Sequence, residues 1–359
     1  VKFVEVCEKI GSGATPRGGK EAYSDEGISL VRSQNVLDFS FSSDGLVHIN
    51  DEQAKKLKNV ELHPDDVLLN ITGDSVARAC IMDSSFLPAR VNQHVAIVRG
   101  KKELVLNSYI LYYLQWKKDY LLQLASAGAT RNALTKGMIE QLDINLPSLT
   151  EQKRIVAVLD SIQQKISVNK KINDNLQQQA AAIFRSWFVD CAPFGGKAPD
   201  EWENVTLEDI TALVSRGITP KYADDTDQIV INQKCIRNHT IDLSLARTHT
   251  PKIINEKWLR FGDLLINSTG DGTLGRAAQV WFQPKNLTVD SHVTIARPAK
   301  ENLIFYIGLW GILHEKEIES LHTGSTGQTE LPRDRVKAME LRLPDNDTLD
   351  RFNALITPM

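Results

Sequence analysis

The chain contains an internal duplication, and this duplication limits the folds that it can adopt. Residues 66–99 and 263–297 align with one inserted residue, Thr15-Pro16 matches Thr219-Pro220, and residues 128–147 match residues 324–344. A repeat of about 200 residues is far longer than the roughly 20–50 residues of solenoid repeats, so the sequence predicts two copies of one domain. The identical pairs in the central segment are Asp66/Asp263, Asn70/Asn267, Thr72/Thr269, Gly73/Gly270, Asp74/Asp271, Arg78/Arg276, His94/His292 and Arg99/Arg297.

Each copy is expected to be an α+β domain with an irregular sheet. Residues 91–99 and 290–298 alternate apolar and polar side chains, which predicts strands, and clusters of Gly, Pro, Asn and Asp separate such segments. The apolar spacing in residues 109–124 and 303–321 predicts one helix in each copy. With 42% hydrophobic residues, the chain is too apolar to be disordered throughout.

Composition also limits the location and chemistry of the protein. The sequence has no apolar run of about 18 residues and no basic-then-apolar start typical of a signal peptide. Its four cysteines lie far apart without a CxxC pair, which argues against a zinc site and a disulfide framework. We therefore expect no membrane span, no metal site and a reducing, cytoplasmic location. A net charge of -3 means that any DNA-binding face is a local patch, or that a partner supplies positive charge.

A long helix is expected between the two copies. Residues 151–188 contain neither Pro nor Gly, and would span about 57 Å as a helix with Thr150 as N-cap. Residues spaced alternately four and three apart form a heptad seam, in which Asn169 and Asn173 would lower stability but fix the register. The seam consists of Ile155, Leu159, Ile162, Ile166, Asn169, Asn173, Leu176, Ala180, Ile183 and Trp187.

The seam favours a second helix as its partner. An ordinary amphipathic helix packed on one domain is the alternative, but the seam is narrow and the outer face is polar. Residues 349–356 (LDRFNALI) follow Leu343-Pro344 as residues 152–159 follow Leu146-Pro147, and therefore predict the start of a second helix. The sequence stops at Met359, after about two turns. We expect another chain, either a second copy or a different subunit, to cover the rest of the seam.

Two domain copies, each followed by Leu-Pro and a heptad helix, resemble the specificity subunit of type I restriction–modification systems. The resemblance covers nearly the whole chain. It rests on LPSLTEQKRIVAVLDSI (146–162), TGSTGQTEL (323–331), the GxTP elements at 13–16 and 217–220, and the LxN segments after Asp66 and Asp263. By this resemblance, residues 1–147 are target recognition domain 1, 148–190 the central conserved helix, 191–344 target recognition domain 2, and 345–359 the start of a truncated distal conserved helix.

The resemblance implies an α+β fold of two recognition domains joined by a coiled-coil-type helix. It implies a subunit without catalysis, in which each domain reads one half of a bipartite DNA target and the helix sets the gap. The implied partners are double-stranded DNA, two modification subunits and restriction subunits. S-adenosylmethionine would be the cofactor of the modification subunit, with no cofactor in this one.

Methyltransferase, zinc-protease and serine-hydrolase motifs are absent from the sequence. The alternative function is a coiled-coil adaptor with duplicated ligand-binding domains and no DNA role.

Candidate DNA-binding residues follow from the chemistry of recognition. Arg, Lys, Asn and Gln match base edges, whereas Arg, Lys, Ser, Thr and loop amides contact phosphates. For each candidate, a solvated loop residue is the alternative. The candidates in copy one are Thr15, Arg17, Arg32, Gln34, Asn35, Arg78, Gln93, Arg131 and Asn132. The candidates in copy two are Arg216, Thr219, Lys221, Asn232, Gln233, Lys234, Arg276, Thr326 and Gln328.

Residues that both copies share favour structural roles, because the two copies would read different DNA. Asn70 and Asn267 are expected to cap loop backbone at a glycine turn, with a phosphate cradle as the alternative. His94 and His292 are expected to be hydrogen-bonded residues within strands rather than catalytic groups.

The helix carries two further groups whose roles are weighed in the same way. Phe184, Trp187 and Phe188 are expected to pack on the second domain, with a docking surface for a modification subunit as the alternative. The lysines are expected to be solvated, with phosphate contact along the spacer as the alternative; they are Lys165, Lys170 and Lys171.

Overall fold

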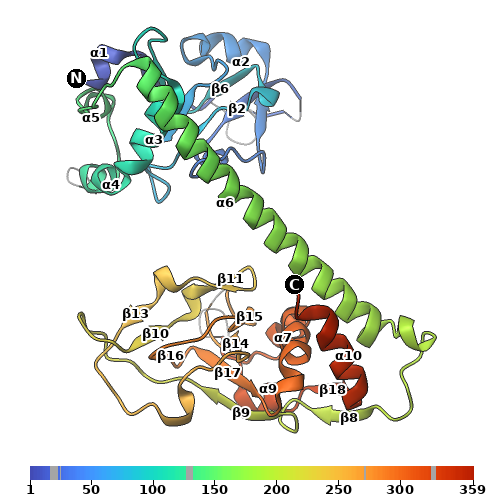
Figure 1. The fold of residues 1–359 in the computed structure, drawn as a ribbon. Helices are drawn as coiled ribbons and strands as arrows, with labels where there is room; N and C mark the ends of the chain where they lie inside the picture. The colour runs from blue at the N-terminus through green and yellow to red at the C-terminus, as the bar shows by residue number, and fades with distance from the viewer. Residues whose placement is uncertain (17–22, 25, 127–131, 271, 325–328) are drawn as a thin grey trace. The chain divides into compact units, whose positions relative to one another are not determined.

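The structure is a computed structural model that describes residues 1–16, 23–24, 26–126, 132–270, 272–324 and 329–359. It contains two compact units, Val1–Val168 and Asn169–Met359. The division between them falls inside α6 (Leu149–Phe184), which is a single continuous helix (Figure 1). Among the described residues, no helix is long and apolar enough to cross a membrane.

The first unit contains two sheets. The larger is antiparallel and four-stranded, in the order β1-β7-β4-β5, and the smaller is three-stranded, in the order β3-β2-β6, with β2 parallel to β6. The strands are β1 (Cys7–Ser12), β2 (Ile28–Val31), β3 (Val47–Ile49), β4 (Val67–Asn70), β5 (Ala79–Ile81), β6 (Ala89–Val91) and β7 (Val95–Gly100).

The second unit repeats this topology. Its four-stranded sheet has the order β15-β14-β17-β9, which is the order of the first unit read from the opposite edge, and its three-stranded sheet β13-β10-β16 again contains one parallel pair. The predicted duplication is therefore confirmed in the order and direction of the strands. These strands are β9 (Thr211–Arg216), β10 (Ile229–Ile231), β13 (Arg247–Thr248), β14 (Leu264–Asn267), β15 (Ala277–Gln279), β16 (Leu287–Val289) and β17 (Val293–Pro298). Two further pairs join β11 (Ile236–Arg237) to β12 (Thr240–Ile241) and β18 (Glu340–Leu343) to β8 (Glu203–Thr206).

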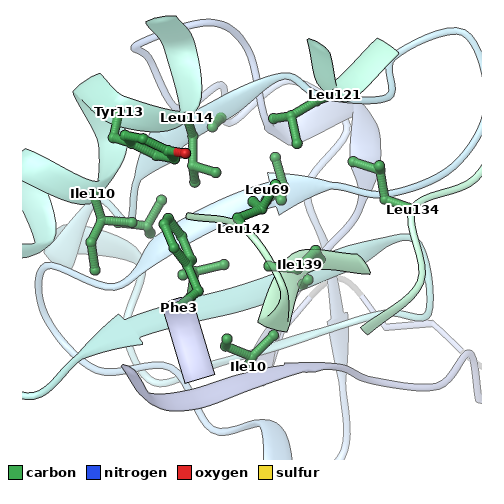
Figure 2. Close-up of a cluster of buried hydrophobic side chains, with 14 of the residues drawn as sticks. Phe3, Ile10, Leu69, Ile110, Tyr113, Leu114, Leu121, Leu134, Ile139 and Leu142 are labelled. Carbon is green, nitrogen blue, oxygen red and sulfur yellow. The ribbon is translucent and has the colours of Figure 1, made fainter. Parts of the chain in front are cut away.

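The helix predicted in each copy is present but broken in two. Residues 109–124 fall in α3 (Asn107–Trp116) and α4 (Lys118–Ser126), and residues 303–321 fall in α7 (Ile304–Leu313) and α8 (Glu315–Ser320). Lys117 and His314 leave helical geometry at the breaks, with ψ of 11° and 15°. In the first unit the break leaves Leu114 and Leu121 in the same core, as Figure 2 shows, while Trp116 remains 74% exposed. The remaining helices are α1 (Phe3–Val6), α2 (Asp51–Lys56), α5 (Lys136–Glu140), α9 (Arg333–Lys337) and α10 (Asn346–Ile356).

The predicted strands 91–99 and 290–298 begin later than expected. β7 starts at Val95 and β17 at Val293, because a turn precedes each strand. The Asn92 side chain accepts a hydrogen bond from the backbone of His94 at 2.9 Å, and Asp290 accepts one from His292 at 2.9 Å. Such Asx turns compete with strand pairing, which the alternation of side chains alone does not reveal.

Both faces of each large sheet are buried. In β4, Val67 and Leu69 face a core built with α3, α4 and α5, in which Figure 2 labels Leu69. Leu68 faces a second core, which is shared with the small sheet. β14 repeats the arrangement, with Leu264 and Leu265 in different cores. A strand that is buried on both faces needs an unbroken apolar run, which explains the sequences VLL and LLI.

A buried ion pair occupies the same position in each copy. Nε and Nη2 of Arg99 contact the two carboxylate oxygens of Asp66 at 2.5 and 2.6 Å, and Arg297 contacts Asp263 at 2.8 Å through both nitrogens. The Arg297 and Asp263 side chains are 7% and 1% exposed. Arg297 also donates to the carbonyl of Trp258 at 2.7 Å, so the pair ties the sheet to the segment that leads into it.

Substitution of Arg297 by Met should lower the free energy of unfolding by about 3–5 kcal/mol, because Asp263 would remain buried without its partner. Urea denaturation followed by fluorescence measures the change. Arg154→Met, which removes an exposed side chain of α6, should change it by no more than about 0.5 kcal/mol. Equal effects of the two substitutions would contradict this assignment.

The glycine of each GxTP element packs directly on a strand. A methyl group at Gly13 would overlap the carbonyl oxygen of Val91, and one at Gly217 would overlap that of Val289. Gly13 donates a backbone hydrogen bond to Asn92 at 3.0 Å, and Gly217 donates one to Val293 at 3.1 Å. These glycines therefore allow two backbone segments to approach more closely than any other residue would permit.

Gly13→Ala and Gly217→Ala should each unfold or strongly destabilise their own copy, by about 2 kcal/mol or more, since backbone rather than a flexible side chain blocks the new methyl group. Thermal unfolding measures the loss. Gly137→Ala is the matched control, because this glycine lies in α5 with no atom near the added methyl group. A stable Gly217→Ala variant with an unchanged melting temperature would disprove the close approach.

The N-terminus of α6 differs from the prediction in one detail. Ser148, rather than Thr150, caps the helix, because its hydroxyl accepts from the backbone of Glu151 at 3.3 Å while Thr150 already lies inside the helix. Gln152 is completely buried and makes three hydrogen bonds: it accepts from the Leu106 amide and donates to the carbonyls of Leu104 and Pro147, each at 2.9 Å. This glutamine, part of the LPSLTEQ motif, anchors the helix to the first unit.

The seam of α6 is covered unevenly. Phe184 is 2% exposed and belongs to the core of the second unit, as predicted. Trp187 and Phe188, in a π-helical turn that continues α6 over Arg185–Val189, pack on Phe352 of α10 at ring distances of 6.0 and 4.8 Å. Trp187 is therefore covered within this chain, and the predicted second helix is present as α10. Along the middle of α6, by contrast, the seam residues Ile162 and Ile166 are 52% and 44% exposed, and Ile172, which lies beside the seam, is 50% exposed.

Candidate nucleic-acid interface

Three predicted residues of the first unit lie together at the end of β4. The side chain of Gln93 accepts a hydrogen bond from the Thr15 backbone at 3.1 Å, and the Gly73 amide donates to the Asn132 carbonyl at 3.2 Å. Gln93 and Asn132 are exposed and Thr15 is half-buried. The GxTP element, the turn before β7 and the loop after β4 therefore meet in one surface.

The shared histidines are structural, as predicted, although they lie in turns and not in strands. Thr72 Oγ1 and His94 Nδ1 are 2.6 Å apart, and Thr269 Oγ1 and His292 Nδ1 are 2.7 Å apart. Each pair joins the loop after the central strand to the turn that precedes β7 or β17. Both copies thus fix this surface with the same contact.

The shared asparagines also have the predicted role. Asn70 donates through Nδ2 to the carbonyl of Ser33 at 2.9 Å, and Asn267 donates to that of Gln233 at 3.1 Å. Both side chains are completely buried. Each therefore holds a short 3-10 turn, Ser33–Asn35 or Gln233–Cys235, against the end of the central strand.

The 3-10 turn of the first unit carries three candidates that differ in accessibility. Gln34 is exposed and donates to the Asp44 carbonyl at 3.2 Å, and Arg32 is half-buried and donates to the Gly45 carbonyl at 2.5 Å. Asn35 is completely buried, and its amide donates to the carbonyls of Ser42 and Asp44. Asn35 was predicted to contact DNA, but its bonds to loop backbone leave it no path to a ligand, so we exclude it.

The corresponding turn of the second unit presents a different set of side chains. Asn232 accepts from the Lys234 backbone at 2.9 Å and so caps the turn, while Lys234 itself is exposed. Gln233 accepts from the hydroxyl of Thr269 at 3.1 Å. Thr219 and Lys221 are exposed on the neighbouring GxTP segment.

Arg216 lies at the edge of this surface in a shallow pocket of about 320 Å³. It forms an ion pair with Glu330 and donates to the Leu331 carbonyl at 2.8 Å. Lys257 and Arg333 also line the pocket. The pocket therefore combines three cations with the carboxylates of Glu330 and Asp334.

One feature of the surface was missed by the sequence analysis. The guanidinium of Arg247 lies over the ring of Tyr222, 3.5 Å from its centroid, and Arg32 lies 5.6 Å from the centroid of Tyr23 in the first unit. Each copy thus places an arginine on a tyrosine at the small sheet. In the sequence, only the Lys221-Tyr222 dipeptide pointed to this contact, as a basic residue next to an aromatic one. The arginine that contacts Tyr222 belongs to β13, which is distant in sequence.

Four predicted residues lie outside the described residues, and two others have no polar side-chain partner among the described ones. Arg17, Arg131, Thr326 and Gln328 belong to the first group. Arg78 and Arg276 are half-exposed, and their side chains have no hydrogen-bonding or ionic partner among the residues that the structure describes. The helix lysines, predicted to be solvated, are exposed; they are Lys165, Lys170 and Lys171.

In each copy, an ion pair joins the segment after the 3-10 turn to a helix. The segment supplies the acid and the helix the base in the first copy, and the reverse holds in the second. In the first unit Asp38 contacts Lys118 of α4 at 2.5 Å, and in the second His239 lies 3.2 Å from Glu315 of α8. The interaction with Glu315 raises the pKa of His239 above its ordinary value, against the opposing effect of burial. Only the second copy therefore has a tether whose strength depends on pH near neutrality.

The His239–Glu315 tether should stabilise the protein fully below about pH 6.5, the ordinary histidine pKa, and should be lost as the pH rises through the raised folded-state pKa. The free energy of unfolding measured by urea between about pH 5.5 and 8.5 should therefore fall more in the native protein than in His239→Gln. Identical pH profiles for the two proteins would refute the coupling. Lys118→Gln is the control from the first unit, and it should leave the pH profile unchanged.

Comparison with known proteins agrees with this architecture. A sequence profile for the type I restriction modification DNA specificity domain matches residues 1–178. The whole chain is 24% identical to the type I restriction enzyme MjaIX specificity subunit of Methanocaldococcus jannaschii and covers 86% of it. Over 55% of the chain it is 24% identical to the HindI specificity subunit of Haemophilus influenzae, of which it covers 43%.

A solved structure has the same fold. The S subunit of a type I restriction–modification system from M. genitalium matches the whole chain with a TM-score of 0.56 at 12% identity, and the match covers 88% of that subunit. The chain belongs to the specificity subunits of type I restriction–modification systems.

Proposed function

We propose that this protein reads DNA sequence for a type I restriction–modification complex, with each unit contacting one half of a bipartite target. The observation that carries the proposal is the duplication: one framework occurs twice in a chain, and its shared buried contacts support different exposed side chains. A protein that recognises two unlike sequences needs this combination of a common scaffold and unlike surfaces.

The chemistry would belong to partner subunits. We propose that two modification subunits methylate adenine with their own S-adenosylmethionine, that restriction subunits cleave, and that the complex works in the cytoplasm. This chain would contribute recognition and no catalytic group. Its net charge of -3 supports a division in which the partners supply part of the electrostatic attraction to DNA.

We also propose that another chain covers the middle of α6 in the assembled complex. The seam residues Ile162 and Ile166 and the neighbouring Ile172 are each about half exposed, and Val158 and Val168 of the same helix are exposed as well. Such a seam is typical of a helix that is buried by association, and self-association through it is one arrangement that would cover it. The roles of Asn169 and Asn173 in setting register remain predictions.

Mapping of methylated adenines in cells that carry this subunit and its modification partner tests the function. We expect a two-part motif with a fixed unspecified gap, because in this proposal the helix sets the distance between the two half-sites. Exchange of the first domain for that of a relative should alter one half-motif only. Insertion of one heptad after Ile166 should change the gap and leave both half-motifs intact.

Two outcomes would count against this function. A change in either half-motif after the heptad insertion would show that the helix does not act as a spacer. DNA affinity that depends on neither sequence nor salt, measured with the modification subunits present, would instead favour the adaptor.

A further inference from the structure

The duplication separates residues that hold the fold from residues that serve a ligand. Asp66 and Arg99 bond to each other, and Thr72 bonds to His94, with the same pairs in the second copy. Asn70 and its counterpart bond to the 3-10 turn. Each of these shared polar residues therefore has a structural reason to occur twice.

Arg78 and Arg276 are the exception among the shared, described basic residues. Both are half-exposed, and no described residue bonds to either side chain. Each arginine occupies the same position in its copy, and it makes no polar side-chain contact with the described residues that would hold the fold. Its common role must lie in something that both copies meet.

The backbone fixes these two arginines in the same place. The Asn70 amide donates to the Arg78 carbonyl at 2.8 Å, and the Asn267 amide donates to that of Arg276 at 2.9 Å. The preceding residues, Ala77 and Gly275, have positive φ of 67° and 82°.

Ala77 adopts this unfavourable conformation although it carries a Cβ atom, so the loop geometry is imposed by its surroundings. Its amide donates to the Asn70 carbonyl at 2.9 Å, as that of Gly275 does to Asn267 at 2.8 Å. Both loops close on the central strand with the same two hydrogen bonds. The side chain of each arginine therefore extends from a backbone position that is held in place at the end of its sheet.

We propose that Arg78 and Arg276 are phosphate anchors, each making one sequence-independent contact with the DNA backbone in its own half-site. This inference rests on the proposed function. Two domains that read different sequences cannot share all of their base contacts, whereas both meet the same phosphate backbone. Exposed positions that differ between the copies, such as Gln34 and Lys234, are the ones available for base reading.

Binding of the full chain with its modification subunits to a fluorescent duplex tests the anchors. The affinity is measured for cognate and non-cognate duplexes over a range of salt concentrations. Arg78→Gln and Arg276→Gln should each reduce the slope of log affinity against log salt by about 0.9, and the double variant by about twice that. At 0.15 M salt each should weaken binding roughly fivefold, equally for both duplexes.

Two controls isolate the contact. Lys197→Gln removes the same charge from an exposed position that is paired with Asp200, and it should leave the slope unchanged. Arg78→Lys should retain the slope because it retains the charge. Thermal unfolding should be unchanged in all variants, since neither arginine has a described internal partner.

An unchanged slope in Arg78→Gln and Arg276→Gln would overturn the inference. Loss of affinity for the cognate duplex only, with a relaxed methylation motif, would also overturn it and indicate base reading. If the unaltered complex showed no salt-dependent, sequence-selective binding, the proposed function itself would fail. The two failures are therefore distinguishable.

Discussion

The buried aspartate–arginine pair is the interaction on which each copy depends. It joins a central strand of the sheet to the segment that leads into that sheet, and both aspartates are completely buried. A charge in such a place is tolerated only when its hydrogen bonds are satisfied. The carboxylates meet this condition by also accepting backbone amides, from His63 for Asp66 and from Arg260 for Asp263. The sheet, its two cores and the loops at its end are therefore positioned together.

The same framework supports two unlike surfaces. The glycine contact of the GxTP element, the Thr–His contact and the Asn contact all repeat, whereas the exposed ends of the loops do not. Reversal of charge in the tether between loop and helix illustrates this freedom: Asp38 pairs with Lys118 in one copy, and His239 with Glu315 in the other. A change of surface needs no change of core.

Much of the architecture could be predicted because it depends on patterns within short segments. The repeat of DVLLN and DLLIN identified the duplicated central strand, and the spacing of Ile155, Leu159 and Ile162 identified the long helix. Residues 349–356 were correctly expected to begin a second helix, which is α10. The family resemblance rested on the same segments.

The errors came from interactions that spacing does not encode. Asn35 has the chemistry of a base-reading residue, but its burial depends on loop 42–45 folding over it. The turns before β7 and β17 interrupt an alternating pattern because an Asn or Asp side chain bonds to the backbone two residues later. The arginine on Tyr222 comes from a strand more than twenty residues away. The burial of Asn35 and the contact on Tyr222 depend on the tertiary fold, whereas the turns depend on a local side-chain bond that competes with strand pairing.

The buried Gln152 has a consequence for how new variants of this protein can arise by recombination. Its amide group is matched to backbone atoms of Leu104, Leu106 and Pro147, all within the first unit. A crossover just upstream of this residue would place Gln152 against a loop from another protein. That loop would have to offer the same backbone atoms to the glutamine side chain. A crossover within the exposed middle of α6 would carry the glutamine along with its own loop. Genetic exchange that joins old halves into new pairs is therefore least disruptive inside the helix.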